Sequence, residues 1–302
     1  MRKGVRRGTR FFALFSLLPL FACASAAPST AALERRLDEV LAGAGGTVAV
    51  AYYDLGTGAT VLRDARLSLH AASTMKVPVM LALFREVDRG ALRRDQPVPV
   101  KNEFASIADG SAFALDPAED GDPELYEALG DTRPLEELMR RMIVRSSNLA
   151  TNLLIELARP ERVMELMRTL GARDIRVLRG VEDEKAYEAG LNNTTTAYDL
   201  MLVLRAIAER RAVTPAASEA MLAILAAQEF KEKIPAGLPA GVAVANKTGD
   251  ITGIHHDAAI VLPAGEPPYV LVVLTKGFAD EAAANTLIAA VSRAVWEARR
   301  LQ

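Results

Sequence analysis

The feature that most constrains the fold is the order in which two hydrophobic periodicities follow one another along the 302 residues. Near both ends of the chain, apolar residues tend to alternate with polar ones, which is the period of a strand. Between the ends they recur every three or four positions, which is the period of a helix. This order predicts an α+β fold: an antiparallel sheet of about five strands built from both chain ends, flanked by terminal helices, with an all-helical domain inserted.

The expected elements divide the chain into two domains. Strands are expected over residues 47–54, 59–62, 242–248, 254–262 and 269–275. Helices are expected over residues 30–42, 73–89, 135–144, 148–157, 161–170, 196–210, 215–227 and 280–299. The predicted α/β domain comprises residues 27–72 and 212–302, and the predicted helical domain comprises residues 73–211, including an acidic insertion at 102–132.

The first residues have the composition of an export leader. Five basic residues between positions 2 and 10 precede an apolar run at 11–22, which is too short to cross a membrane as a stable helix. Small residues follow, as signal peptidases prefer. We therefore expect a signal peptide over residues 1–26 and an exported protein that is periplasmic or associated with the cell envelope.

Cys23 is the only cysteine, so the chain cannot form an intrachain disulfide. It follows Leu20-Phe21-Ala22, which resembles a bacterial lipobox. Two alternatives stay open: a leader that ends at residue 22, with a lipid on Cys23, or cleavage after Ala24 or Ala26, which removes the cysteine. A lipid on Cys23 is the only membrane attachment that we expect.

The charge balance disfavours nucleic acid as a partner. Loss of the five basic leader residues from the 36 in the chain leaves 31 Lys and Arg residues against 38 Asp and Glu residues, a net charge near −7. Basic residues do not gather into a patch with interleaved aromatics. We expect a monomer that needs no cofactor and acts on a small molecule.

Ser73-Thr74-Met75-Lys76 is the only Ser-x-x-Lys tetrapeptide in the chain. A serine oxygen is a poor nucleophile until a neighbouring group takes its proton. A lysine three residues further along a helix lies on the same face and can reach that proton. The spacing therefore makes Ser73 and Lys76 a candidate nucleophile and base.

Two further motifs follow in order, Ser146-Ser147-Asn148 at an expected helix start and Lys247-Thr248-Gly249 at an expected strand end. With Ser-x-x-Lys they form the signature of the penicillin-recognising serine enzymes. The stretches 69–78, 146–152 and 193–196 and the hairpin after Lys247 also resemble this superfamily. From about residue 30 to residue 300 the chain thus resembles a class A β-lactamase-type serine hydrolase. The resemblance implies a β-lactamase/transpeptidase-like fold and an acyl-serine intermediate formed on a strained or D-Ala-like amide.

The resemblance also implies the roles of individual residues. Ser73 is the implied nucleophile, Lys76 its base, and Ser146 a relay that passes a proton to the leaving nitrogen. The backbone N–H groups of Ser73 and Asp250 are the implied oxyanion hole.

Substrate binding is implied for the remaining motif residues. Asn148 would hold Lys76 and the side-chain amide of the substrate. Lys247, Thr248 and Gly249, with Asp250, would bind around a substrate carboxylate.

The resemblance further implies a loop glutamate that activates the deacylating water, and two guides to it disagree. Counting from Ser146 points to Glu182, whereas the pattern Glu-x-x-Leu-Asn points to Glu188. We favour Glu182 on spacing, and Asp183, Glu184 and Glu188 stay open. Without such a carboxylate an acyl-enzyme would hydrolyse slowly.

Three functions remain open at this point. The first is a β-lactamase that acylates and deacylates. The second is a D,D-peptidase, amidase or esterase with the same site. The third is a penicillin-binding envelope protein that acylates and stops.

No metal site is expected. His255 and His256 are adjacent on an expected strand, so they face opposite sides and cannot easily share one ion. The acidic stretch 116–122 lacks the spacing of an EF-hand. Because residues 102–132 contain nine acidic residues and no Lys or Arg, we expect a mostly exposed, solvated loop there.

Overall fold

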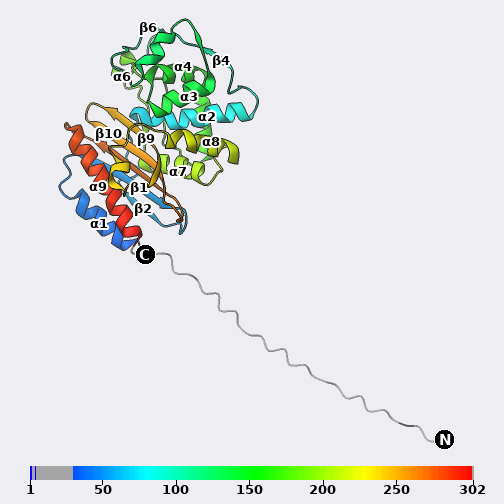
Figure 1. The fold of residues 1–302 in the computed structure, drawn as a ribbon, viewed down its shortest axis with the longest axis vertical. Coiled ribbons are helices and arrows are strands. Elements are labelled where there is room, and N and C mark those ends of the chain that lie inside the picture. Colours follow the sequence, from blue (N-terminus) through cyan, green and yellow to red (C-terminus); the bar gives the residue numbers. More distant parts are fainter. Residues whose placement is uncertain (2–3, 5–29, 301–302) are drawn as a thin grey trace.

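The computed structural model of the protein describes residue 1, residue 4 and residues 30–300, so the predicted signal peptide and Cys23 lie outside the described residues. A five-stranded antiparallel sheet with the strand order β2-β1-β11-β10-β9 forms one half of the molecule (Figure 1). Its strands are β1 (Thr47–Asp54), β2 (Thr60–Arg63), β9 (Ala243–Ile251), β10 (Ile254–Leu262) and β11 (Tyr269–Lys276). The predicted α+β class, with a sheet built from both chain ends, is confirmed.

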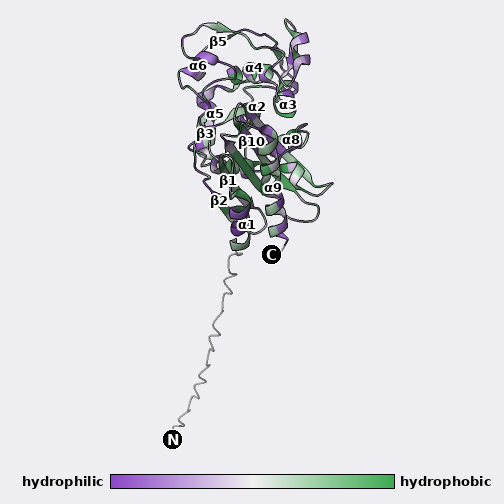
Figure 2. Cartoon of the chain, turned by 90° about the vertical axis from the view of Figure 1, so that its left-hand side faces the viewer, coloured by the Kyte–Doolittle hydropathy of each residue, from purple (hydrophilic) through white to green (hydrophobic). Residues whose placement is uncertain are grey.

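The terminal helices α1 (Ala31–Leu41) and α9 (Glu281–Arg299) pack side by side on one face of this sheet (Figure 1). Leu33 and Leu37 of α1 share a core with Ile288 and Val295 of α9 and with the sheet. Helix α7 (Ala197–Ala208) packs on the other face. Because helices cover both faces, the inner strands β10 and β11 are buried along almost their whole length, and much of the sheet has the hydrophobic colour in Figure 2.

Most of the remaining helices surround α2 and form a core that is continuous with the second face of the sheet. Helix α2 spans Lys76–Asp88, and around it lie α3 (Leu135–Val144), α4 (Asn148–Ala158), α5 (Pro160–Thr169) and α8 (Pro215–Ala226), with the 3-10 helices η1 (Ala72–Met75) and η2 (Pro123–Ala128). The short helix α6 (Glu184–Glu188) belongs to the loop after α5, and the 3-10 helix η3 (Ile234–Gly237) packs against α9. None of the described helices combines the length and the apolar character that a membrane crossing requires. The domain boundaries at residues 72 and 212 stay a prediction.

Three pairs of short strands that the sequence did not predict join the loops of this region. They are β3 (Leu69–His70) with β8 (Thr194–Thr195), β4 (Pro97–Pro99) with β7 (Thr132–Pro134), and β5 (Phe104–Ala105) with β6 (Ala112–Phe113). The first pair matters for the site, because it ties the segment before Ser73 to the end of the loop that contains Glu182.

The predicted helix over 73–89 begins one residue earlier, at Ala72, as the 3-10 helix η1, and becomes α-helical at Lys76. Pro78 has no N–H and cannot donate to the carbonyl of Thr74, four residues back. The turn that carries Ser73 is therefore wound more tightly than α2. A 3-10 turn has three residues per turn, so Ser73 and Lys76 lie on one side of it.

The prediction of a solvated acidic loop over 102–132 is wrong for two of its residues. Asp120 and Asp122 are buried. Asp120 accepts hydrogen bonds from the backbone N–H of Asn148 at 3.0 Å and from that of the next residue at 2.8 Å, and Asp122 pairs with Arg141 at 2.9 Å. The insertion thus holds the start of α4 rather than lying free in solvent.

Candidate active site

Ser146 lies between two buried lysines. Its Oγ is 3.1 Å from Lys76 Nζ and 3.0 Å from Lys247 Nζ. Both lysines are fully buried, and Lys76 Nζ also donates to the Ser146 carbonyl at 2.5 Å and to Asn148 Oδ1 at 2.8 Å. The three sequence motifs, which span more than half the chain, therefore meet around one hydroxyl group.

A buried histidine fixes the segment that leads to Ser73. The Thr275 N–H donates to His256 Nδ1 at 3.1 Å, so His256 Nε2 carries the proton and donates to the His70 carbonyl at 2.9 Å. Burial lowers the pKa of His256 to about 4, which keeps the ring neutral. His70 in turn accepts from the Ala72 N–H at 3.1 Å, which fixes the start of η1.

The free edge of the sheet brings a backbone N–H beside Ser73. His255 uses its N–H and its carbonyl to bind Thr275 on β11, so it faces away from β9. Its partner on β9, Asp250, therefore belongs to a non-hydrogen-bonded pair, and its N–H points out of the edge strand. A side chain at Gly249 would place Cβ only 3.1 Å from the Ser73 nitrogen, so glycine permits this close approach.

Burial changes the proton affinity of both lysines. Loss of hydration lowers the pKa of Lys76 to about 7, although the charges of Asp120 and Glu182 oppose the shift. Desolvation also lowers the pKa of Lys247 well below its usual value, and the neighbouring Lys76 charge acts in the same direction. Near neutral pH a large fraction of Lys76 is an uncharged amine that can accept a proton.

Glu182 is the loop carboxylate that reaches this network. It accepts a hydrogen bond from Asn148 Nδ2 at 2.6 Å, and its backbone has the strained φ of 60°. Asn152 holds the preceding residue in place, because it accepts from the Val181 N–H at 2.7 Å and donates to the Val181 carbonyl at 3.0 Å. The Glu182 side chain is partly exposed to solvent, but protein atoms displace water from around its carboxyl group, and this desolvation raises its pKa.

The other loop carboxylates have different surroundings. Asp183 is buried, where it caps α6 and accepts from Ser106 Oγ at 2.7 Å. Glu184 and Glu188 are exposed at the two ends of α6. Of the four candidates, Glu182 is the one that hydrogen-bonds to a motif residue.

A cleft of about 290 Å³ opens over Ser73. Ser73, Ser146, Asn148, Thr248 and Asp250 line it together with Glu119, Gly121, Arg145, Phe230, Glu232, Lys233 and Glu281. Residues from all three sequence motifs therefore line one cleft, whereas the sequence gave no indication of Lys233, which belongs to no motif. Lys233 Nζ lies 2.7 Å from each carboxylate oxygen of Asp250.

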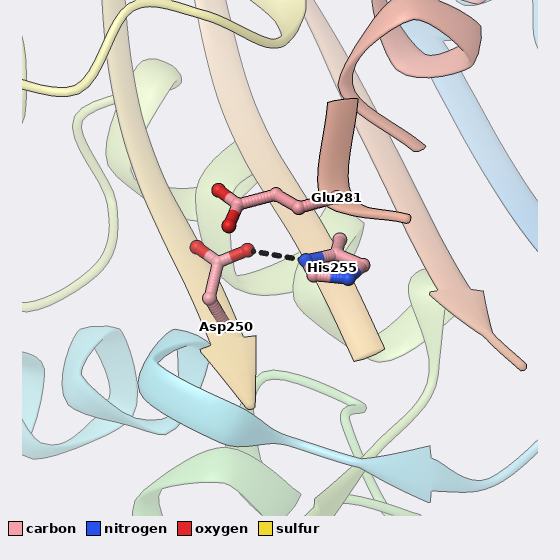
Figure 3. Close-up of side chains that lie close together, drawn as sticks. All are labelled: Asp250, His255 and Glu281. Atoms are coloured by element: carbon pink, nitrogen blue, oxygen red, sulfur yellow. Dashed lines mark hydrogen bonds and ion pairs between the residues drawn. The ribbon is translucent and has the colours of Figure 1, made fainter. Parts of the chain in front are cut away.

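His255 and His256 do face opposite sides, yet His255 gathers with two acidic residues of the cleft rim (Figure 3). One donor atom from each of Asp250, His255 and Glu281 lies within 4.8 Å of the others. Lys233 already places an ammonium on both oxygens of Asp250, and a divalent cation would have to displace or lie beside that charge. The group therefore fits an ion-pair cluster better than a metal site.

Comparisons with known proteins agree with this geometry. The sequence profile of the beta-lactamase enzyme family matches residues 32–298. A beta-lactamase of Streptomyces albus G is 29% identical over 269 residues, which are 87% of this chain and 83% of that protein.

Two solved structures are similar over most of their length. A beta-lactamase from Xanthomonas campestris has a TM-score of 0.77 at 25% identity, with 88% of this chain and 96% of that chain covered. An ancestral class A beta-lactamase has a TM-score of 0.76 at 28% identity, with 88% and 99% covered. Since the family profile spans nearly all of the described fold, the chain belongs to the beta-lactamase enzyme family.

Proposed function

We propose that the protein opens the amide bond of β-lactams through an acyl-enzyme on Ser73 and releases the product by hydrolysis. The observation that carries the proposal is the placement of Ser146 Oγ within hydrogen-bond distance of Lys76 and Lys247, beside the nucleophile. The beta-lactamase names of the relatives support the substrate class.

Acylation begins when the neutral amine of Lys76 accepts the proton of the Ser73 hydroxyl. The Ser73 oxygen attacks the carbonyl carbon, and the backbone N–H groups of Ser73 and Asp250 stabilise the negative oxygen that forms. Lys76 returns the proton through Ser146 Oγ to the leaving nitrogen, so the C–N bond breaks and the nitrogen leaves as a neutral amine. Ser146 can serve this relay because both ammonium groups donate to its oxygen and leave its own proton free.

Deacylation requires a base for a water molecule, and Glu182 is the residue that we assign to it. The Glu182 carboxylate takes a proton from the water, whose oxygen attacks the ester carbon. The ester bond breaks, and the proton returns to Ser73. The raised pKa of Glu182 makes its carboxylate a stronger base than an ordinary glutamate.

Export is part of the proposal. The basic start, the apolar run and the small residues after it support a leader over residues 1–26. Fractionation of cells that produce the full chain should find the enzyme outside the cytoplasm, and radiolabelled palmitate with the Cys23→Ser variant tests the lipid anchor. Cytoplasmic activity from the full chain would remove this part of the proposal.

A chromogenic cephalosporin tests the chemistry directly. Steady turnover by the wild type, lost in Ser73→Ala, is the expected result. A single stoichiometric burst would instead identify a slow penicillin-binding protein, and no reaction would favour a peptidase, amidase or esterase. Full activity of Ser73→Ala would show that the nucleophile is assigned wrongly.

A further inference from the structure

The cations around the cleft are already engaged by the protein. Lys247 is fully buried and donates to Ser146 Oγ and, at 2.8 Å, to the Thr248 carbonyl. Arg145 pairs with Asp122 at 2.9 Å and with Glu124 at 2.6 Å. Every cation among the described residues that line this cleft therefore already has a partner within the protein.

Lys233 is the second cation that lines this cleft, and Asp250 covers it. The Lys233 side chain is 4% exposed, whereas the Asp250 side chain is 38% exposed. Both oxygens of Asp250 contact Lys233 Nζ at 2.7 Å, so the aspartate lies between the ammonium and the open cleft. Asp250 thus occupies the position that a substrate carboxylate would take on Lys233.

The surrounding charge strengthens this effect. Glu119, Glu232 and Glu281 are exposed and line the same cleft as Asp250. His255 Nδ1 lies 3.0 Å from Asp250 Oδ1 and helps to hold the aspartate in place (Figure 3). An incoming anion meets this group of carboxylates before it reaches Lys233, and like charges placed close together are repulsive.

We propose that Asp250 is a specificity-determining residue that competes with the substrate's carboxylate for Lys233 and so favours amides that bear an uncharged or cationic group beside the scissile nitrogen. The inference rests on the proposed function, since it concerns the substrates of the same Ser73 site. The side chain of Asp250 acts here, whereas its backbone N–H belongs to the oxyanion hole.

Benzylpenicillin and its methyl ester test the proposal, because esterification removes the charge of the carboxyl group and adds only a methyl group. We expect Asp250→Asn to raise the ratio of kcat/KM for the acid to kcat/KM for the ester by at least about tenfold. Asp250→Ser serves as a second variant should the asparagine protein fold poorly. An acid-to-ester ratio that stays within twofold of the wild type in both variants overturns the proposal.

Two controls separate competition for Lys233 from general repulsion. Glu281→Gln removes one repulsive charge from the same rim but leaves the Lys233–Asp250 pair intact, so it should raise the ratio much less than Asp250→Asn does, by no more than about twofold. The double variant Asp250→Asn with Lys233→Ala should lose the gain, because the cation is gone. A gain in Glu281→Gln equal to that in Asp250→Asn, or a gain that survives Lys233→Ala, contradicts the assignment.

Binding measured without acylation keeps this inference separate from the proposed function. In the Ser73→Ala background, calorimetry gives the Kd of the acid and of the ester, with and without Asp250→Asn. If the wild type acylates no β-lactam but Asp250→Asn tightens binding of the acid alone, the proposed function fails and the specificity role stands. If turnover is normal and neither ratio changes, the specificity role fails and the function stands.

Discussion

Glu182 and Asn148 are joined by a hydrogen bond of 2.6 Å, in which the side-chain amide of Asn148 donates to the carboxylate. The oxygen of the same amide accepts from Lys76 at 2.8 Å. Asn148 therefore connects the base proposed for acylation with the base proposed for deacylation and fixes the positions of both. Its donor also stabilises the ionised form of Glu182 against the effect of desolvation.

Replacement of Glu182 by glutamine should separate the two half-reactions. Glutamine keeps a hydrogen-bond acceptor for Asn148 but cannot take a proton from water. We expect deacylation to slow by about 10²- to 10⁴-fold, the usual contribution of a general base, while acylation continues. Intact-protein mass spectrometry after mixing with a penicillin should show a Ser73 adduct that accumulates.

Glu188→Gln is the matched control, because Glu188 is exposed on α6 in the same loop. It should turn over at the wild-type rate without a lasting adduct. An adduct in Glu188→Gln and none in Glu182→Gln would transfer the role to Glu188. An adduct in neither variant would mean that no carboxylate of this pair activates water.

The acylation rate should depend on pH through Lys76. Only the neutral amine can accept the serine proton, and the pKa of Lys76 is lowered to about 7. The single-turnover acylation rate should therefore rise as pH increases through about 7 and level off above it. Stopped-flow measurement of the acylation phase isolates this step from deacylation, in which Glu182 titrates.

Lys76→Arg tests the assignment of that pH profile, since a guanidinium stays protonated throughout. Acylation should fall sharply, and the step near pH 7 should disappear. Lys101→Ala, which removes an exposed lysine paired with Glu156, should keep the wild-type profile. A wild-type acylation rate that is constant between pH 6 and pH 8 would contradict a Lys76 base.

Local sequence patterns predicted much of the fold and named residues that meet in one cleft. Strand β10 and helix α3 have the bounds that their periodicities predicted, because burial on a sheet face or a helix face repeats at a fixed interval. Ser73 and Lys76 could be paired from spacing alone, since three residues make one turn of η1. Ser146 and Lys247 could be identified only from the resemblance, because the order of the three motifs along the chain is what defines that superfamily.

Residues that act through contacts distant in sequence left no such signal. Asp120 looked like one of nine acidic residues in a solvated loop, yet it binds the start of α4, 28 residues away. Lys233 lies two residues after Lys231 and belongs to no motif, and the packing of η3 against α9 and β10 brings it to Asp250. Periodicity reports which face of an element is buried, but not which polar group it meets there.

Removal of Asp120 should therefore destabilise the protein more than an acidic loop residue ordinarily would. Asp120→Ala leaves two backbone N–H groups at the start of α4 and the Tyr126 hydroxyl without their acceptor. We expect the free energy of unfolding to fall by about 1–3 kcal/mol. Urea denaturation of Asp116→Ala, an exposed residue of the same insertion, should show a change of less than about 0.5 kcal/mol. Equal losses in the two variants would mean that Asp120 does not support α4.

Gly249→Ala should impair catalysis while leaving the fold intact. The added Cβ would lie 3.0 Å from the Thr74 nitrogen and 3.1 Å from the Ser73 nitrogen, so the edge of β9 must move away from η1 by a few tenths of an ångström. That movement separates the two N–H groups of the proposed oxyanion hole.

We expect kcat/KM for a β-lactam to fall by about 10- to 100-fold, since oxyanion donors act only at the correct distance. Gly45→Ala is the control, because a Cβ there meets nothing within 4 Å, and its kcat/KM should match the wild type. Unchanged kcat/KM in Gly249→Ala would show that η1 and β9 need not approach so closely, and the oxyanion hole would have to be sought elsewhere around Ser73.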